Sequence, residues 1–158
     1  YKEENTMEPK IIEKPGFTVV GIRYFGKNEK GEIPALWEDL MKRAGEIKNK
    51  SGVMESYGLM GMMDKEGNFE YIACLPVEKV AELPEGMVSR KIDDTKYLVF
   101  THVGDAKKMK KTYDFVYNKY CQDCDEEIRY DTYHFELYDE RFKNFAPDSE
   151  FDIYIPIK

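Results

Sequence analysis

The predicted order of strands and helices repeats once along this chain, and the repeat limits its possible folds more than any other feature. Each half reads strand, helix, strand, strand, and each ends in an apolar–proline–apolar run, Leu75-Pro76-Val77 and Ile155-Pro156-Ile157. The pattern predicts an α+β fold of duplicated βαββ units, with a mainly antiparallel sheet and two main helices on one face. Because two such units meet along a pseudo-twofold seam, we expect a ligand cleft there.

The expected elements follow from residue type and spacing. β-branched and aromatic runs predict strands, whereas apolar residues three and four apart predict helices. Strands are expected over residues 17–24, 56–62, 68–75, 86–92, 96–102, 133–138 and 151–157, and the first helix over 34–49. The second helix is expected after Asp105, which suits an N-cap. Residues 1–15 are polar and interrupted by Pro9 and Pro15, so no element is expected there.

Composition and charge narrow the class of protein. The 158 residues suffice for one domain, and their net charge of −7 is unfavourable for nonspecific nucleic-acid binding. An acidic chain suits a cationic ligand better. No segment approaches the roughly 20 consecutive apolar residues of a membrane helix, and residues 1–10 show no signal-peptide pattern. We therefore expect a cytoplasmic protein with no membrane partner.

Three cysteines give no clear sign of a metal or redox site. An odd number argues against a secreted disulfide framework. Cys121 and Cys124 have CxxC spacing, but no second CxxC or paired histidine supplies the other ligands that zinc needs. The pair also follows a helix, whereas a redox pair normally begins one. We expect ordinary loop cysteines, with no metal and no cofactor.

Short motifs follow one another in a fixed order along the chain: Val19 to Ile22, Leu36-Trp37, Glu46-Ile47, Tyr57-Gly58, Phe69 to Ala73, Leu83 to Met87, Tyr97 to Gly104, Phe135 to Asp139 and Ser149 to Pro156. This series resembles the GyrI-like effector-binding family, which also supplies effector domains of AraC-type regulators. It spans residues 9–158, and Cys74 departs from it, because a small residue such as glycine is expected there. The resemblance implies the fold above and a cavity for flat, often cationic organic molecules. It also implies an acidic cavity residue, which corresponds to Glu136.

Glu136 also attracts attention without the resemblance. In a strand, alternate side chains point to opposite faces, so His134, Glu136 and Tyr138 share one face. A carboxylate at mid-strand is either solvated on an open face or held in a lined pocket. Buried without a partner it is costly and its pKa rises, and a bound cation relieves that cost. The resemblance favours the pocket.

Other candidate ligand-binding residues are aromatic or flexible apolar side chains on the predicted helix and strands. They are Trp37, Tyr57, Met60, Tyr71, Tyr138 and Tyr154. For each of these residues the alternative to ligand binding is a purely structural role in the core or the sheet, since apolar stripes usually pack inward. Together they are suited to aromatic walls, hydroxyl contacts and an adaptable thioether surface.

No catalytic residue is assigned, because the sequence lacks a nucleophile elbow, a P-loop, a zinc-protease motif and a dinucleotide-binding glycine set. The expected function is therefore binding of a small organic ligand rather than catalysis. Two alternatives stay open. One is hydrolysis of strained electrophiles with Glu136 as general base, and the other is a gyrase-inhibitor-like protein-interaction module.

The first residues suggest a larger context. Residues 1–8 are interpreted as a tail or linker and residues 9–158 as the effector-binding domain. Tyr1 to Asn5 resembles the end of an AraC-type helix-turn-helix domain. This predicts the sensor part of a transcriptional regulator, which contacts DNA only through an upstream domain. The rival is a free-standing protein that begins near Met7; the sequence identifies neither the natural ligand nor the oligomeric state.

Overall fold

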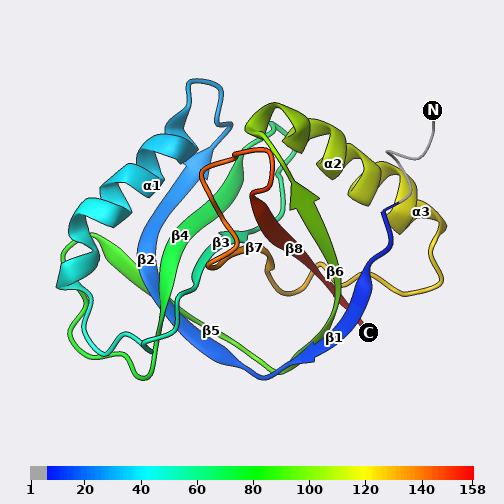
Figure 1. Cartoon of the computed structure of the whole chain (residues 1–158). Helices are drawn as coiled ribbons and strands as arrows, with labels where there is room; N and C mark the ends of the chain where they lie inside the picture. The colour runs from blue at the N-terminus through cyan, green and yellow to red at the C-terminus, as the bar shows by residue number, and fades with distance from the viewer. Residues whose placement is uncertain (1–6) are drawn as a thin grey trace.

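The computed structural model describes residues 7–158, in which one eight-stranded sheet carries the helices on one face (Figure 1). The sheet order is β1-β6-β8-β7-β3-β4-β2-β5, and every paired strand is antiparallel. The strands are β1 (Lys10–Lys14), β2 (Phe17–Gly26), β3 (Ser56–Met60), β4 (Phe69–Val77), β5 (Met87–Ile92), β6 (Thr95–Val103), β7 (His134–Tyr138) and β8 (Glu150–Ile157). The α+β prediction is confirmed.

The helices cover the two halves of this sheet separately. In the first half, α1 (Glu32–Arg43) packs on β2 and β4 and ends in a 3-10 turn, Ala44–Glu46. In the second half, α2 (Met109–Phe115) continues through a π-helical turn, Val116–Tyr120, into the short α3 (Cys121–Asp123). As expected, Asp105 caps the entry to this segment, and its side chain accepts a hydrogen bond from the backbone N–H of Lys108.

The strand order contains the predicted repeat. Strands β2, β3 and β4 of the first unit mirror β6, β7 and β8 of the second, and the two units join where β3 pairs with β7. At this seam Gly58, the third residue of β3, lies opposite Glu136, the third residue of β7. The pseudo-twofold axis therefore passes between these two residues.

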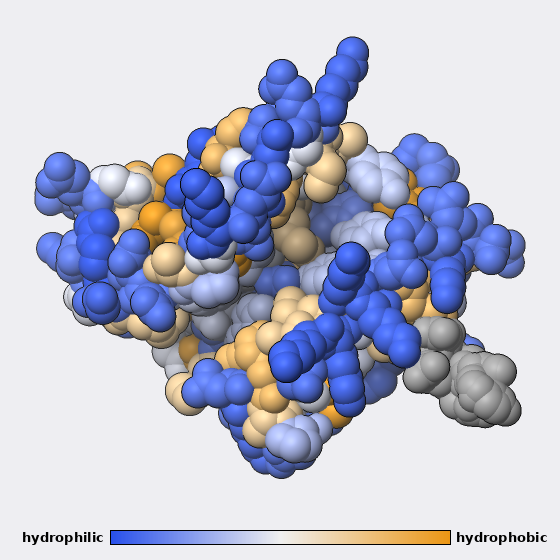
Figure 2. Space-filling view, turned by 90° about the horizontal axis from the view of Figure 1, so that it is seen from above, coloured by the Kyte–Doolittle hydropathy of each residue, from blue (hydrophilic) through white to orange (hydrophobic). Residues whose placement is uncertain are grey.

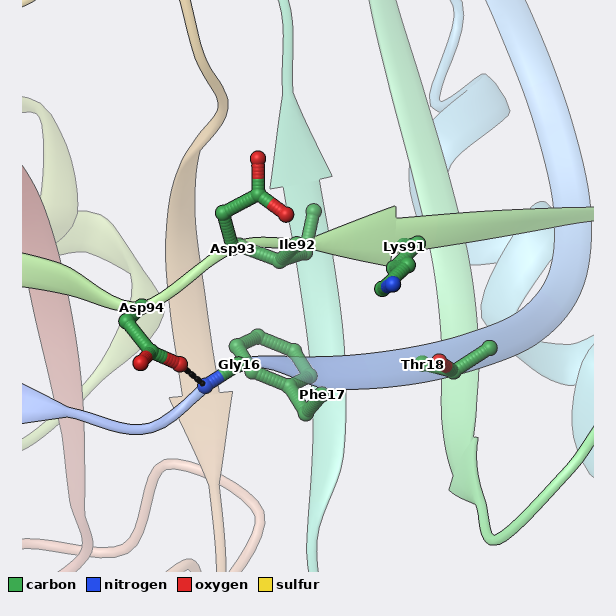
Figure 3. Close-up of a pocket in the computed structure, with 7 residues that line it drawn as sticks. All are labelled: Gly16, Phe17, Thr18, Lys91, Ile92, Asp93 and Asp94. Carbon is green, nitrogen blue, oxygen red and sulfur yellow. Dashed lines mark hydrogen bonds between the residues drawn. The ribbon is translucent and has the colours of Figure 1, made fainter.

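Two sharp bends bring the edges of the sheet together. Only Pro15 and Gly16 separate β1 from β2, and the chain bends there. Because of this bend, β1 pairs with β6 while β2 pairs with β5. The backbone N–H of Gly16 donates to Asp94 Oδ1 at 2.6 Å, which ties this bend to the equivalent bend between β5 and β6 (Figure 3). A Cβ atom on Gly16 would lie 2.7 Å from the carbonyl oxygen of Ile92, so the close approach requires glycine.

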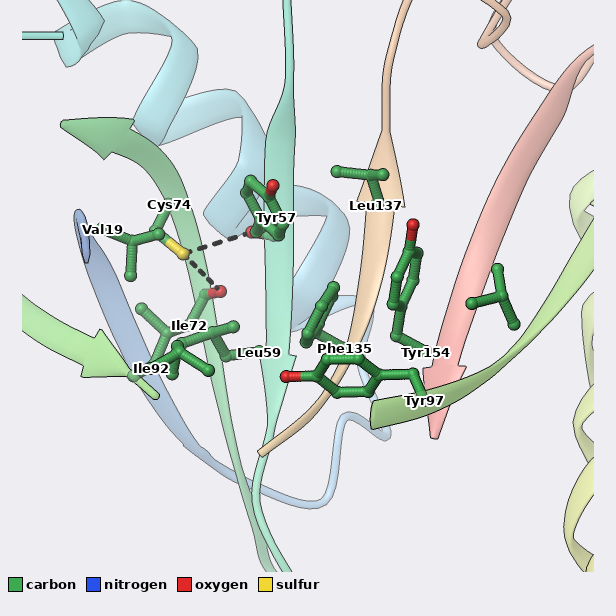
Figure 4. Close-up of a cluster of buried hydrophobic side chains, with 11 residues drawn as sticks. Val19, Tyr57, Leu59, Ile72, Cys74, Ile92, Tyr97, Phe135, Leu137 and Tyr154 are labelled. Carbon is green, nitrogen blue, oxygen red and sulfur yellow. Dashed lines mark hydrogen bonds between the residues drawn. The ribbon is translucent and has the colours of Figure 1, made fainter. Parts of the chain in front are cut away.

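The curled face of the sheet, opposite the helices, encloses an aromatic core (Figure 4). Phe135 is fully buried there and its ring contacts Phe17, Tyr57, Tyr97 and Tyr154 at centroid distances of 4.7 to 5.5 Å. Such offset and edge-to-face pairs add to the stabilisation from buried area. Separate apolar clusters lie beneath α1 and beneath α2.

The largest departures from the predicted elements are a strand that was not expected and a helix that ends early. Residues 10–14 form β1, although no element was expected, because an exposed edge strand shows no clear alternation of apolar residues. The first helix ends at Arg43 instead of 49, since Gly45 lies in the 3-10 turn and Ile47 is extended. The interpretation of Tyr1 to Asn5 lies outside the described residues. No helix within residues 7–158 is long and apolar enough to span a membrane.

Replacement of Phe135 by alanine tests the contribution of the aromatic core. We expect Phe135→Ala to lower the free energy of unfolding by about 3–5 kcal/mol, because it leaves a cavity among four aromatic rings. Phe25→Ala is the control, since Phe25 is 52% exposed, and its effect should stay within about 0.5 kcal/mol. Urea unfolding measures both, and equal effects would contradict the assignment of this cluster as the main core.

Candidate ligand-binding cavity

A cavity of about 1200 Å³ lies above the seam and is lined by residues of α1, α2, β3, β4 and β7. Seen from the side of the helices, the molecule is hollowed between two lobes, and hydrophilic side chains project around the hollow (Figure 2). Most of the lining is aromatic or apolar, and it includes Ile33, Trp37, Met41, Met60, Met62, Met63, Phe69, Tyr71, Met109, Tyr113, Tyr117, Tyr130, His134, Glu136, Tyr138, Phe142 and Phe145. The predicted cleft at the seam is therefore present.

Strand alternation places Glu136 on the floor of this cavity. Phe135 and Leu137 point into the aromatic core, so Glu136 faces the helices together with His134 and Tyr138. Glu136 as a residue is 5% exposed, and its carboxyl group accepts hydrogen bonds from three tyrosine hydroxyls. Those of Tyr71 and Tyr138 donate to Oε1 at 2.6 and 3.0 Å, and that of Tyr113 donates to Oε2.

These tyrosines satisfy the carboxylate without neutralising its charge. Burial raises the pKa of Tyr71, Tyr113 and Tyr138 well above the ordinary tyrosine value, so each hydroxyl keeps its proton and donates. Burial also raises the pKa of Glu136, and the three hydrogen bonds only partly oppose this effect. Among the described residues that line the cavity, Glu136 is the only acidic one and none is lysine or arginine. The cavity thus holds a buried carboxylate without a cationic partner.

Trp37 extends this network to α1. Its indole Nε1–H donates to the hydroxyl oxygen of Tyr71 at 3.0 Å, and that hydroxyl donates in turn to Glu136. The Trp37 ring also makes edge contacts with the rings of Tyr71 and Tyr138, at centroid distances of 6.5 and 5.4 Å. The helix, the sheet and the carboxylate are therefore connected through one chain of polar contacts.

Gly58 provides the space for this arrangement. A Cβ atom at this position would lie 2.0 Å from the Tyr71 hydroxyl oxygen and 2.9 Å from Glu136 Oε1. Real Cβ atoms do not approach other atoms this closely. The Tyr71 side chain crosses β3 to reach Glu136, and only glycine allows it to pass.

The structure brings five of the seven predicted ligand-binding residues to the cavity: Trp37, Met60, Tyr71, Glu136 and Tyr138. It does not bring Tyr57 and Tyr154 there. Both point into the aromatic core on the other face of the sheet, where each is less than a tenth exposed. The expectation that they line the pocket is corrected. In β3 and β8 the residues next to Tyr57 and Tyr154 in sequence face the helices, so these two tyrosines face the other way.

Sequence reasoning missed Tyr113 and Tyr117 as cavity residues. Tyr113 lies on α2 and Tyr117 in the π-helical turn that continues it, and the phenol of Tyr113 directly contacts the Glu136 carboxylate. A signal was available in the repeat, since both helices must flank the same seam. The aromatic residues of the second helix then stand opposite Trp37 of the first.

Other chemistry-bearing groups lie apart from this network. Cys121 and Cys124 are free thiols, and no three metal-ligating side chains gather anywhere within residues 7–158. Cys74 is buried in the core and donates to the carbonyl oxygen of Tyr57. The hollow at the sheet bends is smaller, about 500 Å³, and the Asp94 carboxylate in it accepts from Gly16.

This fold, with a cavity above the seam of two repeats, defines an effector-binding domain. Residues 10–157 match the family model of Cass2, an integron-associated effector binding protein, and the chain belongs to this family. The GyrI-like resemblance is thereby confirmed. The chain is 36% identical over 152 residues to the transcriptional regulator BrlR of Pseudomonas aeruginosa, covering 96% of this chain and 56% of BrlR. It thus spans little more than half the length of that relative.

Solved structures share the fold at low sequence identity. SAV2435, solved with bound tetraphenylphosphonium, superimposes with a TM-score of 0.76 at 19% identity, covering 96% of this chain and 94% of SAV2435. EcmrR, in a complex with DNA, gives a TM-score of 0.78 at 14% identity, covering 99% of this chain and 60% of EcmrR. The similarity establishes the α+β architecture.

Gly58→Ala tests whether the close approach of Tyr71 and Glu136 depends on glycine. We expect a loss of about 1–3 kcal/mol in the free energy of unfolding, because the new methyl group must displace the Tyr71 ring. Trp37 fluorescence should change as well, since its indole donates to Tyr71. In the control Gly45→Ala the new Cβ meets open space, so the change should be neutral or slightly stabilising. An unaltered Gly58→Ala protein would refute the steric argument.

Glu136→Gln tests the electrostatic cost of the carboxylate. The pKa of Glu136 is raised in the folded protein, so between the ordinary and the raised value the folded state binds a proton that the unfolded state has released. Stability therefore falls as pH rises through this window. We expect urea unfolding to show Glu136→Gln gaining stability relative to wild type as pH rises, unlike the exposed control Glu140→Gln. A difference independent of pH would contradict the raised pKa.

Proposed function

We propose that the cavity binds a lipophilic organic cation as effector, with the positive charge of the ligand near Glu136. The observation that carries the proposal is the single carboxylate, surrounded by tyrosines and unpaired with any lysine or arginine, on the floor of an aromatic cavity. A cation with a large apolar surface complements both properties of this site.

The energetics favour a cation over a neutral or anionic ligand of the same shape. A buried carboxylate is unfavourable until an opposite charge approaches it. At an effective dielectric constant of about 20, a cation 5–6 Å away gains about 3 kcal/mol. Aromatic faces such as those of Trp37 and Tyr138 add cation–π attraction. The tetraphenylphosphonium bound to SAV2435, which shares this fold, supports the same ligand class.

The biological role that we propose is that of the ligand sensor of a transcriptional regulator. BrlR is a regulator of greater length, and EcmrR shares the fold and was solved on DNA. DNA contact would then come from another part of the protein. The assignment to the AraC type stays a prediction that rests on the sequence of Tyr1 to Asn5. The boundary of the domain near residue 9 also stays a prediction.

Tetraphenylphosphonium binding to wild type and Glu136→Gln tests the proposed ligand class. Trp37 is the only tryptophan and lines the cavity, so its fluorescence reports occupancy, and calorimetry gives the affinity. We expect saturable binding to wild type and an affinity about 10- to 100-fold lower in Glu136→Gln, which corresponds to 1.4–2.8 kcal/mol. Glu140→Gln, which removes an exposed charge elsewhere, should bind like wild type.

Tetraphenylborate, an anion of the same shape, separates charge selection from hydrophobic binding. We expect it to bind wild type weakly and to gain affinity in Glu136→Gln. Equal binding of both ions to both proteins would overturn the cation proposal. Recovery of a hydrolysed product from an electrophilic probe, with loss of that turnover in Glu136→Gln, would instead support the hydrolase alternative. Absence of binding by every ion would favour the protein-interaction module.

A further inference from the structure

Two of the three cysteines share the last turn of the second helical segment. Although the sequence predicts a loop here, Cys121–Asp123 form α3, at the right of Figure 1. The backbone N–H of Cys124 still donates to the carbonyl oxygen of Tyr120 at 2.9 Å. Both cysteines are free and partly buried, whereas Cys74 is buried in the aromatic core on the other face of the sheet. The CxxC pair is therefore held on one helical turn.

The geometry of this turn suits a disulfide bond. Residues three apart in an α-helix have Cα atoms about 5 Å apart, and disulfide-bonded cysteines have Cα atoms roughly 4.4–6.8 Å apart. The sulfur of Cys124 lies 3.8 Å from the carbonyl oxygen of Cys121, so its side chain is folded back over the turn. The two sulfurs can therefore be joined without a large movement of the backbone.

The pair is also connected to the wall of the cavity. The backbone N–H of Cys121 donates to the carbonyl oxygen of Val116 and closes the π-helical turn. That turn contains Tyr117, which lines the cavity, as does Tyr130. Burial raises the pKa of both tyrosines, and the nearby Cys121 thiol raises it further. Because π-helical turns are irregular insertions in a helix, a constraint on Cys121 acts directly on the turn that positions Tyr117.

We propose that Cys121 and Cys124 form a reversible disulfide, and that this bond increases the affinity of the cavity for its ligand by fixing the π-helical turn. The first part stands without the proposed function, and the second part rests on it. A cross-link removes motion that ligand binding otherwise has to remove, which is the usual gain from preorganisation. Oxidation and binding then favour each other, so the ligand shifts the thiol–disulfide equilibrium by the same factor.

The co-reactant that suits this pair is a small disulfide such as glutathione disulfide. Burial raises the pKa of Cys121 to about 12, so this thiol stays protonated at neutral pH and Cys124 attacks first. The Cys124 thiolate displaces one glutathione thiolate and forms a mixed disulfide. The Cys121 sulfur, one turn away, then loses its proton, attacks the Cys124 sulfur and displaces the second glutathione. Two electrons pass from the cysteines to the glutathione disulfide, and the released thiolates take up the two cysteine protons.

Equilibration with varied ratios of oxidised to reduced glutathione, followed by alkylation and trypsin, tests the disulfide. Residues 120–129 form one tryptic peptide that contains both cysteines. At oxidising ratios we expect mass spectrometry to show this peptide without two hydrogens and without alkylation, and doubly alkylated again after reduction. Cys74→Ala should behave like wild type, and Cys121→Ser should stop at the glutathione adduct of Cys124. Only glutathione adducts in wild type, only disulfide-linked dimers, or full alkylation at every ratio would overturn the proposal.

Calorimetry with tetraphenylphosphonium tests the coupling. We expect oxidised wild type to bind about two- to tenfold more tightly than reduced wild type, the gain when one side chain is already immobilised. The same ligand should raise the ratio of disulfide to dithiol by an equal factor at a fixed glutathione ratio. The double variant Cys121→Ser, Cys124→Ser should bind like reduced wild type in both buffers.

The outcomes separate this inference from the proposed function. Equal affinity of the oxidised and reduced proteins would overturn the coupling. Failure of tetraphenylphosphonium to bind either form would overturn the proposed function and the coupling with it, while the mass of the peptide would still decide the disulfide. A ligand that strengthens on oxidation of the double variant as well would assign the effect to another residue and overturn the coupling.

Discussion

The buried carboxylate of Glu136, held by three tyrosine hydroxyls, is the interaction on which the rest of the site depends. Each hydroxyl comes from a different part of the fold: Tyr71 from β4, Tyr113 from α2 and Tyr138 from β7 itself. The register of the sheet and the position of α2 must therefore both be correct before the carboxylate is satisfied. Because its pKa is raised all the same, the site retains an electrostatic cost, as is common where binding rather than stability is selected.

The duplication explains why only one such carboxylate is present. Gly58 and Glu136 hold equivalent places in β3 and β7 and face each other beside the pseudo-twofold axis. A side chain at both positions would fill the same space, as the contacts of a Cβ on Gly58 show. The first repeat therefore contributes glycine where the second contributes glutamate. The same seam also receives different aromatic residues, Trp37 from α1 and Tyr113 from α2, so a symmetric scaffold carries an asymmetric site.

The sequence predicted most of the fold and the centre of the site, and the errors have identifiable causes. Alternation within one strand was sufficient to place Glu136 and Tyr138 on the same face, and helical spacing placed Trp37 toward the sheet. Tyr57 and Met60 were both expected in the pocket, although an odd spacing in one strand puts them on opposite faces. For Tyr154 no such check exists, because the face of β8 that meets the helices depends on pairing between strands. The edge strand β1 was missed for the same reason, because its strand conformation depends on pairing with β6, which the local sequence does not show.

Net charge is a poor guide to the ligand of such a protein, and the choice of tyrosine as the partner of Glu136 shows why. The chain carries a net charge of −7, but surface charges are screened within about 8–10 Å at physiological salt. Arginine in place of one tyrosine would also satisfy the carboxylate, and it would cancel the negative potential that a ligand senses. Phenolic hydroxyls satisfy the same oxygen atoms and leave the charge in place. The proposed selectivity for a cation therefore rests on the hydrogen-bond donors of the cavity floor, where a neutral donor leaves the charge of the carboxylate uncancelled.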